Sequence, residues 1–503
     1  GGDSLLYIQD GIGQLPGLEV GQGAPAGAAK AAGEGCLPED ALDLASWGDG
    51  RPALDLLAEA RAGLYGEFDR LSPEALRRAI EVHLYLGFGA EALQYGRLLP
   101  GSDTDPGLAP LLAIARLIDG ESDPGSLFAP MLGCDGPAAL WAALAYTGLP
   151  KDAEVNTDAI VRGFQALPAH LRRYLGPGLS NLLLDRDPEA ARMVRDAVER
   201  TPDVPAGTVA LIDAEADLKA ARPEDALGHA EAAVEDVGTG LPGLLALVEA
   251  HFQSGQPLSP EVAASLLAYR DAGAEDKAGR DRATVLALAL SGQVEAAFKL
   301  ADPADPVIAD LWRVVAKLAE DSPFLAQAVL RPSDPAPPVE PDVALAVAVR
   351  LLDLGFAEAS KVWLGAVDAA SSGEARLTAA KAELALGDAR KALELLSGLD
   401  GQEVPVLRAE AYRQLGAYDA AMQALDSAGK PEDSARLAAW DANWAYVQDR
   451  GTPSWATAAT LAQPSPADAA GPLAEGRAAL DDSAAARQAI NALLADVPAP
   501  QDR

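Results

Sequence analysis

The chain has 503 residues, a formal net charge of −35 and an isoelectric point of about 4.4. Binding to nucleic acid or to an anionic membrane depends on Lys and Arg, so this charge argues against both partners. Apolar residues make up 49% of the chain and aromatic residues only 5%, so Ala and Leu supply most of the apolar surface. This composition favours helices over sheets. No apolar stretch reaches the roughly 18–20 residues that span a bilayer, so we expect no direct membrane insertion.

The first forty residues lack a helical pattern. They begin Gly1-Gly2-Asp3 without Met and combine a short strand-like run, Ser4–Gln9, with a stretch rich in Gly and Ala. We interpret residues 1–40 as an N-terminal extension and linker. A start without Met is typical of a chain whose leader or tag has been removed. We therefore expect a periplasmic location, with the cytoplasm as the alternative.

The two cysteines, Cys36 and Cys134, could form one disulfide because their number is even. Cys36 precedes the first predicted hairpin and Cys134 opens the fourth, so stacked helices would separate them by about 30 Å. A disulfide needs Cα atoms within about 7 Å of each other. We therefore do not favour a Cys36–Cys134 bridge, which would require the N-terminal segment to fold back.

Residues 41–330 form the predicted N-terminal arm, a succession of apolar helical segments separated by short turns. Several segments open with a residue that can cap a helix, followed by Pro at the first helical position. Such starts appear at Ser72-Pro73, Asp187-Pro188, Ser259-Pro260, Ser322-Pro323 and Ser465-Pro466. They support a regular order of helical hairpins.

A proline-rich segment, residues 331–341, interrupts this pattern. It holds five prolines in eleven positions, a density that excludes a helix. We interpret it as a break between the N-terminal arm and a C-terminal arm, residues 342–496. Residues 497–503 are expected to be a frayed tail.

The clearest repeat lies in the C-terminal arm around Gly416. An aromatic residue, Tyr418, follows the Gly by two positions and a small one, Ala421, by five, while Pro431 closes the unit. Gly accepts the left-handed conformation that ends a helix, and a small Ala allows close packing of the second helix. The unit around Gly387 matches as well. The pattern resembles the tetratricopeptide repeat. Sel1-like and other helical-hairpin repeats stay open, because the first-helix Trp-Leu-Gly-Tyr signature is largely missing.

Similar turns recur along almost the whole chain, with a mean spacing of about 33 residues against about 34 in the tetratricopeptide repeat. The candidate turn residues are Gly48, Gly87, Gly120, Gly148, Arg186, Ala221, Gly255, Gly292, Asp321, Gly355, Gly387, Gly416, Arg450 and Asp482. The fold expected from the resemblance is all-α, a right-handed superhelical solenoid of about fourteen tetratricopeptide-like hairpins.

Motifs that would indicate catalysis are missing from the sequence. The four histidines are not paired at metal-binding spacing, and no phosphate-binding Gly-rich loop or Gly-x-Ser-x-Gly nucleophile motif occurs. We expect no metal, no cofactor and no enzymatic activity. Lytic transglycosylases combine a helical superhelix with a catalytic domain, but here the hairpin pattern continues to the C-terminal region and leaves no room for one.

In tetratricopeptide arrays the first helix of each hairpin lines the concave face. When these positions are counted back from the turn Gly of each hairpin, the resemblance implies five binding residues: Arg77, Glu81, Lys381, Glu410 and Arg413. The expected partner is a protein or peptide, because a solenoid offers a long concave surface. The excess of acidic residues either forms a solubilising surface or, as the more specific alternative, lines a groove for a basic partner.

The function that these features favour is a protein-binding scaffold or assembly factor in a bacterial cell-envelope machine. One alternative is the non-catalytic superhelical arm of an envelope enzyme similar to a lytic transglycosylase. A structural spacer without a ligand is the third hypothesis.

Overall fold

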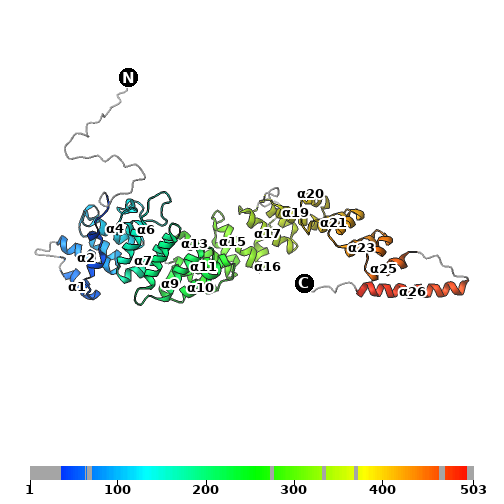
Figure 1. Cartoon of the computed structure of the whole chain (residues 1–503), viewed down its shortest axis with the longest axis horizontal. Helices are drawn as coiled ribbons and strands as arrows, with labels where there is room; N and C mark the ends of the chain where they lie inside the picture. The colour runs from blue at the N-terminus through cyan, green and yellow to red at the C-terminus, as the bar shows by residue number, and fades with distance from the viewer. Residues whose placement is uncertain are drawn as a thin grey trace, which may run out of the picture. The chain divides into compact units, whose positions relative to one another are not determined.

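The computed structural model describes residues 35–62, 64, 71–271, 277–330, 336–367, 372–463 and 471–495 (Figure 1). These residues form 26 α-helices and several short 3-10 helices, with no β-strand among them. The all-α fold class is therefore confirmed. The strand-like run Ser4–Gln9, the Ser465-Pro466 helix start and the tail 497–503 lie outside the described residues.

The chain divides into two compact units, with the boundary between Ser254 and Gly255. In unit 1 the helices are α1 (Ala53–Ala62), α2 (Pro73–Leu86), α3 (Gly89–Gly96), α4 (Ala109–Ile118), α5 (Ala138–Leu144), α6 (Thr157–Ala166), α7 (Ala169–Leu184), α8 (Pro188–Glu199), α9 (Ala206–Lys219), α10 (Pro223–Val234) and α11 (Gly240–Ser254). The 3-10 helices of unit 1 are η2 (Glu39–Leu42), η3 (Leu44–Gly48), η5 (Ser102–Thr104), η6 (Ala129–Met131) and η7 (Val237–Thr239).

Unit 2 continues with the remaining helices. They are α12 (Pro260–Asp271), α13 (Lys277–Leu290), α14 (Val294–Leu300), α15 (Val307–Leu318), α16 (Asp321–Ala328), α17 (Pro341–Asp353), α18 (Ala357–Leu364), α19 (Gly373–Ala385), α20 (Ala389–Leu396), α21 (Val404–Gln414), α22 (Tyr418–Ser427), α23 (Pro431–Trp440), α24 (Trp444–Arg450), α25 (Pro453–Ala462) and α26 (Pro472–Ala495).

Helices that follow one another in the chain pack as pairs. In unit 1, α7 packs on α8 and α9 on α10, while in unit 2 the pairs include α17 with α18 and α19 with α20. The first helices of successive pairs also touch, since α7 contacts α9, and α13, α15, α17, α19 and α21 each contact the next. This double set of contacts is typical of a helical repeat, in which each hairpin packs on its neighbours.

Six of the predicted turn glycines end α-helices with the same left-handed turn, whereas Gly148 is not in the left-handed conformation and lies four residues after the end of α5. At Gly87 the φ angle is 83°, and the backbone N–H of Gly87 donates to the carbonyl of Leu84 while that of Phe88 donates to His83. This pair of hydrogen bonds satisfies carbonyls left open at a helix end. The same left-handed turn occurs at Gly120, Gly292, Gly355, Gly387 and Gly416, and at Ala221, where no glycine is present.

Two predicted turns near the C-terminus are wrong. Asp482 lies inside the continuous helix α26, whose Ala- and Leu-rich sequence contains no residue that stops a helix at that point. Arg450 is the last residue of α24, and the left-handed turn inside that hairpin lies earlier, at Ala442. Asn443 caps α24 there by accepting from the N–H of Tyr446. The last of the fourteen predicted hairpins, centred on Asp482, is therefore a single long helix.

The predicted helix starts agree with the structure at three of the four places where it can be compared. The Ser72 hydroxyl accepts from the N–H of Ala75, Asp187 accepts from Ala190, and α12 begins at Pro260. The Ser322-Pro323 start is wrong by a short distance, because α16 already begins at Asp321 after Glu320.

The segment predicted as a break, 331–341, is only partly described. Residues 336–340 are not helical, and α17 begins at Pro341. Residues 331–335 lie outside the described part of the chain. Its role as a joint between the arms 41–330 and 342–496 remains a prediction.

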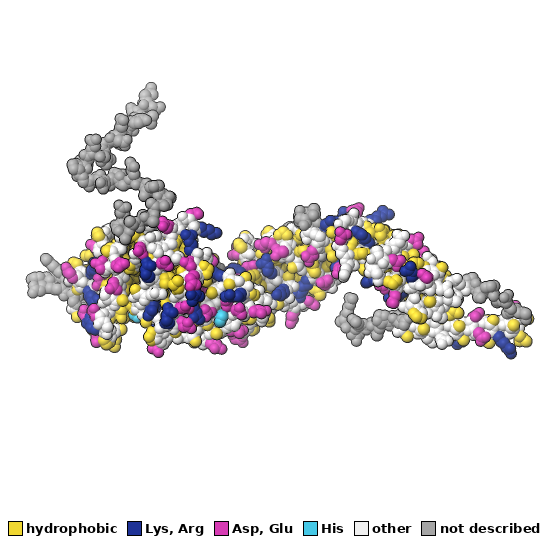
Figure 2. Space-filling view, viewed as in Figure 1, with side chains coloured by type: hydrophobic (Ala, Val, Ile, Leu, Met, Phe, Trp, Pro, Cys, Tyr) yellow, Lys and Arg dark blue, Asp and Glu magenta, His cyan; other side chains and the backbone are white. Residues whose placement is uncertain are grey.

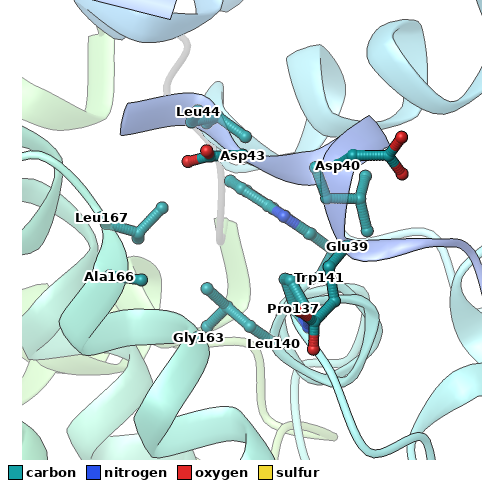
Figure 3. Close-up of a pocket in the computed structure, with 11 residues that line it drawn as sticks. Glu39, Asp40, Asp43, Leu44, Pro137, Leu140, Trp141, Gly163, Ala166 and Leu167 are labelled. Atoms are coloured by element: carbon teal, nitrogen blue, oxygen red, sulfur yellow. The ribbon is translucent and has the colours of Figure 1, made fainter. Parts of the chain in front are cut away.

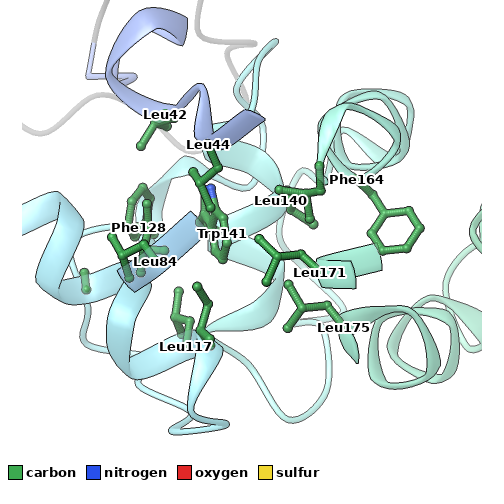
Figure 4. Close-up of a cluster of buried hydrophobic side chains, with 14 of the residues drawn as sticks. Leu42, Leu44, Leu84, Leu117, Phe128, Leu140, Trp141, Phe164, Leu171 and Leu175 are labelled. Atoms are coloured by element: carbon green, nitrogen blue, oxygen red, sulfur yellow. The ribbon is translucent and has the colours of Figure 1, made fainter. Parts of the chain in front are cut away.

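Unit 1 is built around large side chains that are completely buried. Helix α5, with the sequence AALWAAL, is apolar on every side and therefore lies in the interior. Trp141 of α5 and its neighbours Phe128 and Phe164 have no exposed surface (Figure 4). Leu42 and Leu44, from the segment that precedes α1, also pack into this cluster.

The expectation against a Cys36–Cys134 disulfide is wrong. The two residues are bridged, with their Cα atoms 6.0 Å apart. The estimate of about 30 Å assumed that the N-terminal segment leads away from the end of a stack. Instead, η2 and η3 fold back over α5 and α6, because Leu42 and Leu44 gain burial in the core there.

Within the described residues, no helix is both long enough and apolar enough to cross a membrane.

Candidate functional site

The five residues predicted to bind a partner form local ion pairs. Arg77 pairs with Glu81 on α2 (Nε–Oε1 2.8 Å), and Arg413 pairs with Glu410 on α21 (Nη2–Oε1 2.5 Å). Lys381 of α19 pairs with Glu403 (2.7 Å). Arg77 and Glu81 therefore belong to unit 1, and Lys381, Glu410 and Arg413 to unit 2.

Pairing of charges is general on this acidic chain. On the face shown in Figure 2, Lys and Arg side chains are interspersed with Asp and Glu instead of gathering in one patch. Exposed ion pairs contribute little to stability individually. They do reduce the number of charges that remain free for a ligand.

A groove of about 630 Å³ lies on the first helices of three successive hairpins in unit 2. It is lined by Ala316 and Lys317 of α15, by Asp342, Leu345, Ala346, Val349, Arg350 and Asp353 of α17, and by Glu374 of α19. The lining positions of α17 recur at intervals of three and four residues, so they form one face of that helix. We call this surface the α17 groove.

Ion pairs that connect successive hairpins occur on both sides of the α17 groove. Arg313 of α15 pairs with Asp342 of α17 (3.2 Å), and Lys381 of α19 pairs with Glu403, just before α21 (2.7 Å). Lys381 stands six residues before its turn residue Gly387, and Arg313 stands five residues before Leu318, the last residue of α15. In both pairs a cation on the first helix of one hairpin reaches a carboxylate at the start of the next first helix.

The corresponding pair between α17 and α19 is missing. Six residues before Gly355 the chain has Val349 instead of a cation. The acidic partner is nevertheless present, since Glu374 stands thirteen residues before Gly387, as Asp342 does before Gly355. Glu374 and Asp353 have no ion pair within the described residues. The groove thus combines a half-exposed apolar floor with two uncompensated carboxylates and one unpaired cation, Lys317 of α15.

Arg350 fixes one wall of the α17 groove. Its guanidinium donates to the carbonyls of Val315 (2.9 Å) and Ala316 (3.0 Å) and to Asp321 Oδ1 (2.9 Å), and it lies 4.3 Å from the ring centroid of Phe324. It thereby caps the C-terminal end of α15 and ties α17 to it. Because its donors are used in this way, Arg350 is a structural cation of the groove.

A second cavity, of about 600 Å³, lies between α7, α8 and α9 in unit 1. Its floor includes Leu184 and Ile212, and its charged residues are already paired, as Arg195 is with Asp213 (2.9 Å) and Lys219 with Asp185 (2.7 Å). These pairs leave fewer groups free for a ligand than the α17 groove does.

Next to this second cavity, α9 carries an unusual carboxyl. Burial raises the pKa of Glu215 to about 7, against the attraction of Lys219 and a hydrogen bond from Asn181. Its Oε2 has no hydrogen-bond partner among the described residues. Removal from water favours the neutral form of a carboxyl, and here it outweighs the interactions with Lys219 and Asn181.

Three of the four histidines lie within hydrogen-bond distance of a structural partner. His83 Nδ1 lies 2.6 Å from the carbonyl of Ala79, His170 Nε2 lies 2.5 Å from that of Tyr85, and His229 Nδ1 lies 2.8 Å from Asp217. Among the described residues there is no group of three or more His, Cys, Asp or Glu arranged to hold a metal ion.

The fold defines a class, an all-helical protein with repeat-like pairing of successive helices. Comparisons with protein-family models, with curated proteins and with solved structures gave no match. Function is therefore inferred from the geometry of the described residues.

Proposed function

We propose that the chain is a non-enzymatic protein-binding scaffold, a right-handed solenoid of tetratricopeptide-like hairpins that holds a peptide segment of its partner in the α17 groove. The missing ion pair at Val349 and Glu374 supports this most directly. Where neighbouring hairpins compensate an acidic residue internally, this one leaves it beside an apolar floor. A segment with a Lys or Arg next to a large apolar residue complements both features.

The charges of the α17 groove favour a basic partner over a nucleic acid. Of the groove's charged lining residues, Asp342 and Arg350 are used within the protein, while Asp353, Glu374 and Lys317 have no ion pair among the described residues, so the unpaired charge of the lining is net negative. Phosphate groups would meet carboxylates there, whereas a basic side chain would find its counter-charge. The proposed partner is therefore a basic protein segment.

The disulfide supports an oxidising compartment, because such bridges persist outside the reducing cytosol. We therefore propose the periplasm as the location and a bacterial cell-envelope assembly as the setting. Fractionation of the source cells tests this location. Recovery of the chain only from the cytosol, with both cysteines reduced, would contradict it.

The binding proposal can be tested by supplying the missing cation. The variant Val349→Lys places an ammonium where the neighbouring hairpins have one, so it should pair with Glu374 and compete with a basic ligand. Fluorescence anisotropy with a labelled Leu-Lys hexapeptide should show a dissociation constant about 5–10-fold higher than for the unmodified chain. Glu374→Gln should weaken binding similarly.

The matched control is Glu394→Gln, which makes the same charge change on α20 away from the groove and should leave affinity unchanged. A Leu-Glu hexapeptide should bind more weakly than the Leu-Lys probe. Equal binding of both peptides, or unaltered affinity in Val349→Lys, would overturn the proposal.

A further inference from the structure

A third cavity, of about 440 Å³, lies in unit 1 between the folded-back N-terminal segment and helices α5 and α6 (Figure 3). It is separate from the α17 groove, which belongs to unit 2. One side comes from η2 and η3 and the other from the two helices. Its lining residues are Glu39, Asp40, Leu42, Asp43, Leu44, Pro137, Leu140, Trp141, Gly163, Ala166 and Leu167.

The rim of this cavity is negatively charged and contains no basic residue. Glu39, Asp40 and Asp43 are exposed, and none of them forms an ion pair within the part of the chain that the structure describes. Arg162 stands next to the lining residue Gly163, but it is engaged by Asp135. A cation that enters the cavity would therefore meet carboxylates that have no internal partner.

An independent feature points to a ligand in the same place. Trp141 has no exposed surface, and its Nε1–H has no acceptor among the described residues. Its side chain lies across the middle of Figure 3, between the segment that carries Asp40 and Asp43 and the helical residue Leu140. A buried donor without an acceptor is unfavourable, so a ligand that supplies one gains affinity.

Another buried tryptophan shows what is missing. The Nε1–H of Trp363 in unit 2 donates to the carbonyl of Ala328 at 2.9 Å. Trp363 is as completely buried as Trp141, and its indole donor is satisfied. The Nε1–H of the buried Trp312 also lacks an acceptor among the described residues, but Trp312 lines none of the three cavities described above.

We infer that this cavity binds an Arg or Lys residue of an extended peptide. The cationic head would reach the carboxylates of the rim. Leu42, Leu140 and Trp141 have almost no exposed surface in this structure, so the folded-back segment would shift outward slightly to admit the aliphatic stem and to let a peptide carbonyl accept from Trp141 Nε1. A simple polyamine offers no acceptor for this donor, and an acidic ligand would be repelled by the rim.

The indole N–H gives a direct readout. The chain has seven tryptophans, so selective ¹⁵N labelling gives seven indole signals, and Trp141→Phe identifies the one from Trp141. Titration with N-acetyl-L-arginine amide should move the Trp141 indole proton downfield in a saturable way, as expected for a new hydrogen bond. The matched neutral ligand, N-acetyl-L-citrulline amide, has nearly the same shape and should cause a much smaller shift.

The carboxylates are tested by the double variant Asp40→Asn with Asp43→Asn. Both residues are exposed, so the variant should fold, and its dissociation constant for the arginine compound should rise about tenfold. The control Glu91→Gln with Glu121→Gln makes the same charge change at exposed sites outside the cavity. Equal shifts with citrulline, or an unmoved Trp141 signal up to tens of millimolar ligand, would overturn the inference.

Discussion

At the scale of single residues, the turns between paired helices depend on one backbone conformation. Gly416 and Ala442 hold this position in neighbouring hairpins of unit 2, with φ angles of 73° and 53°. A side chain with a Cβ is strained there by about 1–2 kcal/mol, although Gly costs more entropy on folding. The two residues therefore form a natural pair of opposite substitutions.

The first prediction concerns this pair. Ala442→Gly should stabilise unit 2 by about 0.5–1 kcal/mol, and Gly416→Ala should destabilise it by about 1 kcal/mol, because only the second adds a strained Cβ. Space is not the cause, since nothing lies within 4 Å of a Cβ placed on Gly416. Urea denaturation measures both changes. Substitutions that shift the midpoint in the same direction would contradict this account.

Glu215 gives a prediction about pH. Its pKa is raised from an ordinary value near 4.5 to about 7, so the folded chain keeps a proton that the unfolded chain has released. The unfolding free energy should therefore be highest below about pH 4.5 and fall as the pH rises to about 7. Glu215→Gln removes this penalty and should be more stable than the unmodified chain by about 1–3 kcal/mol at pH 8.

The comparison at two pH values isolates this effect. At pH 5 the variant and the unmodified chain should differ little, because Glu215 is then neutral in the folded state. Glu231→Gln, at an exposed position of α10, serves as the control. An advantage of Glu215→Gln that is equal at both pH values would show that packing, not charge, is the cause.

At the scale of helices, arginines close open helix ends. Arg350 does so for α15, while Arg376 donates to the carbonyls of Leu395 and Ser397, and Arg408 to those of Leu396 and Leu399, at the end of α20. A guanidinium suits this task because its donors form a fixed planar fork. On an acidic chain these cations thus serve the backbone as well as the carboxylates.

This explanation predicts that Arg350→Lys is not conservative. One ammonium cannot reach the carbonyls of Val315 and Ala316 and the carboxylate of Asp321 together, so the unfolding free energy of unit 2 should fall by about 1–3 kcal/mol. Arg436→Lys is the control, because Arg436 pairs only with Asp433 on its own helix. Equal effects of the two substitutions in chemical denaturation would argue against the capping role.

Local signals in the sequence predicted much of this level of structure. The turn at Gly87 and the caps at Ser72 and Asp187 depend on residues within a few positions, so they are legible from the chain alone. Asp482 was misplaced because the mean spacing of the repeats was extended into a segment without a helix stop. Periodicity predicts where a turn could fall, but a residue that breaks the helix must be present.

The candidate site was less predictable. The distance from the turn Gly correctly indicates Lys381 as a residue on the first helix of its hairpin, but not that Glu403 neutralises it. The missing cation at Val349 can be recognised only when the sequence of α17 is aligned with those of the neighbouring first helices. Without that alignment, a single Val in a helix is ordinary. The unpartnered donor of Trp141 depends on contacts across unit 1, for which the sequence has no signal.

At the scale of the whole molecule, the disulfide has the largest expected effect on stability. It joins residues 98 positions apart, so it restricts the unfolded chain strongly. Reduction should lower the unfolding free energy of unit 1 by about 2–5 kcal/mol. Thermal melting with and without a phosphine reductant measures the loss. The double variant Cys36→Ser with Cys134→Ser should melt like the reduced protein and ignore the reductant.

The bridge also bears on ligand binding. It anchors the segment that supplies Glu39, Asp40 and Asp43 to the proposed arginine or lysine cavity, next to the buried leucines Leu42 and Leu44. The α17 groove in unit 2 contains no such anchor. Loss of the bridge should therefore weaken ligand binding in the cavity more than ligand binding in the α17 groove. One experiment can thus test the two proposed sites independently.

The same covalent link has a mechanical consequence. When a protein is stretched between its ends, a bridged loop stays closed and its residues cannot join the extended chain. With the bridge intact, the 98 residue steps between Cys36 and Cys134 withhold roughly 340 Å of extension. Under force in an oxidising compartment, the section between Cys36 and Cys134 would thus add no length to the extended chain. The helices of unit 2, from Gly255 onward, could unfold and extend under the same force.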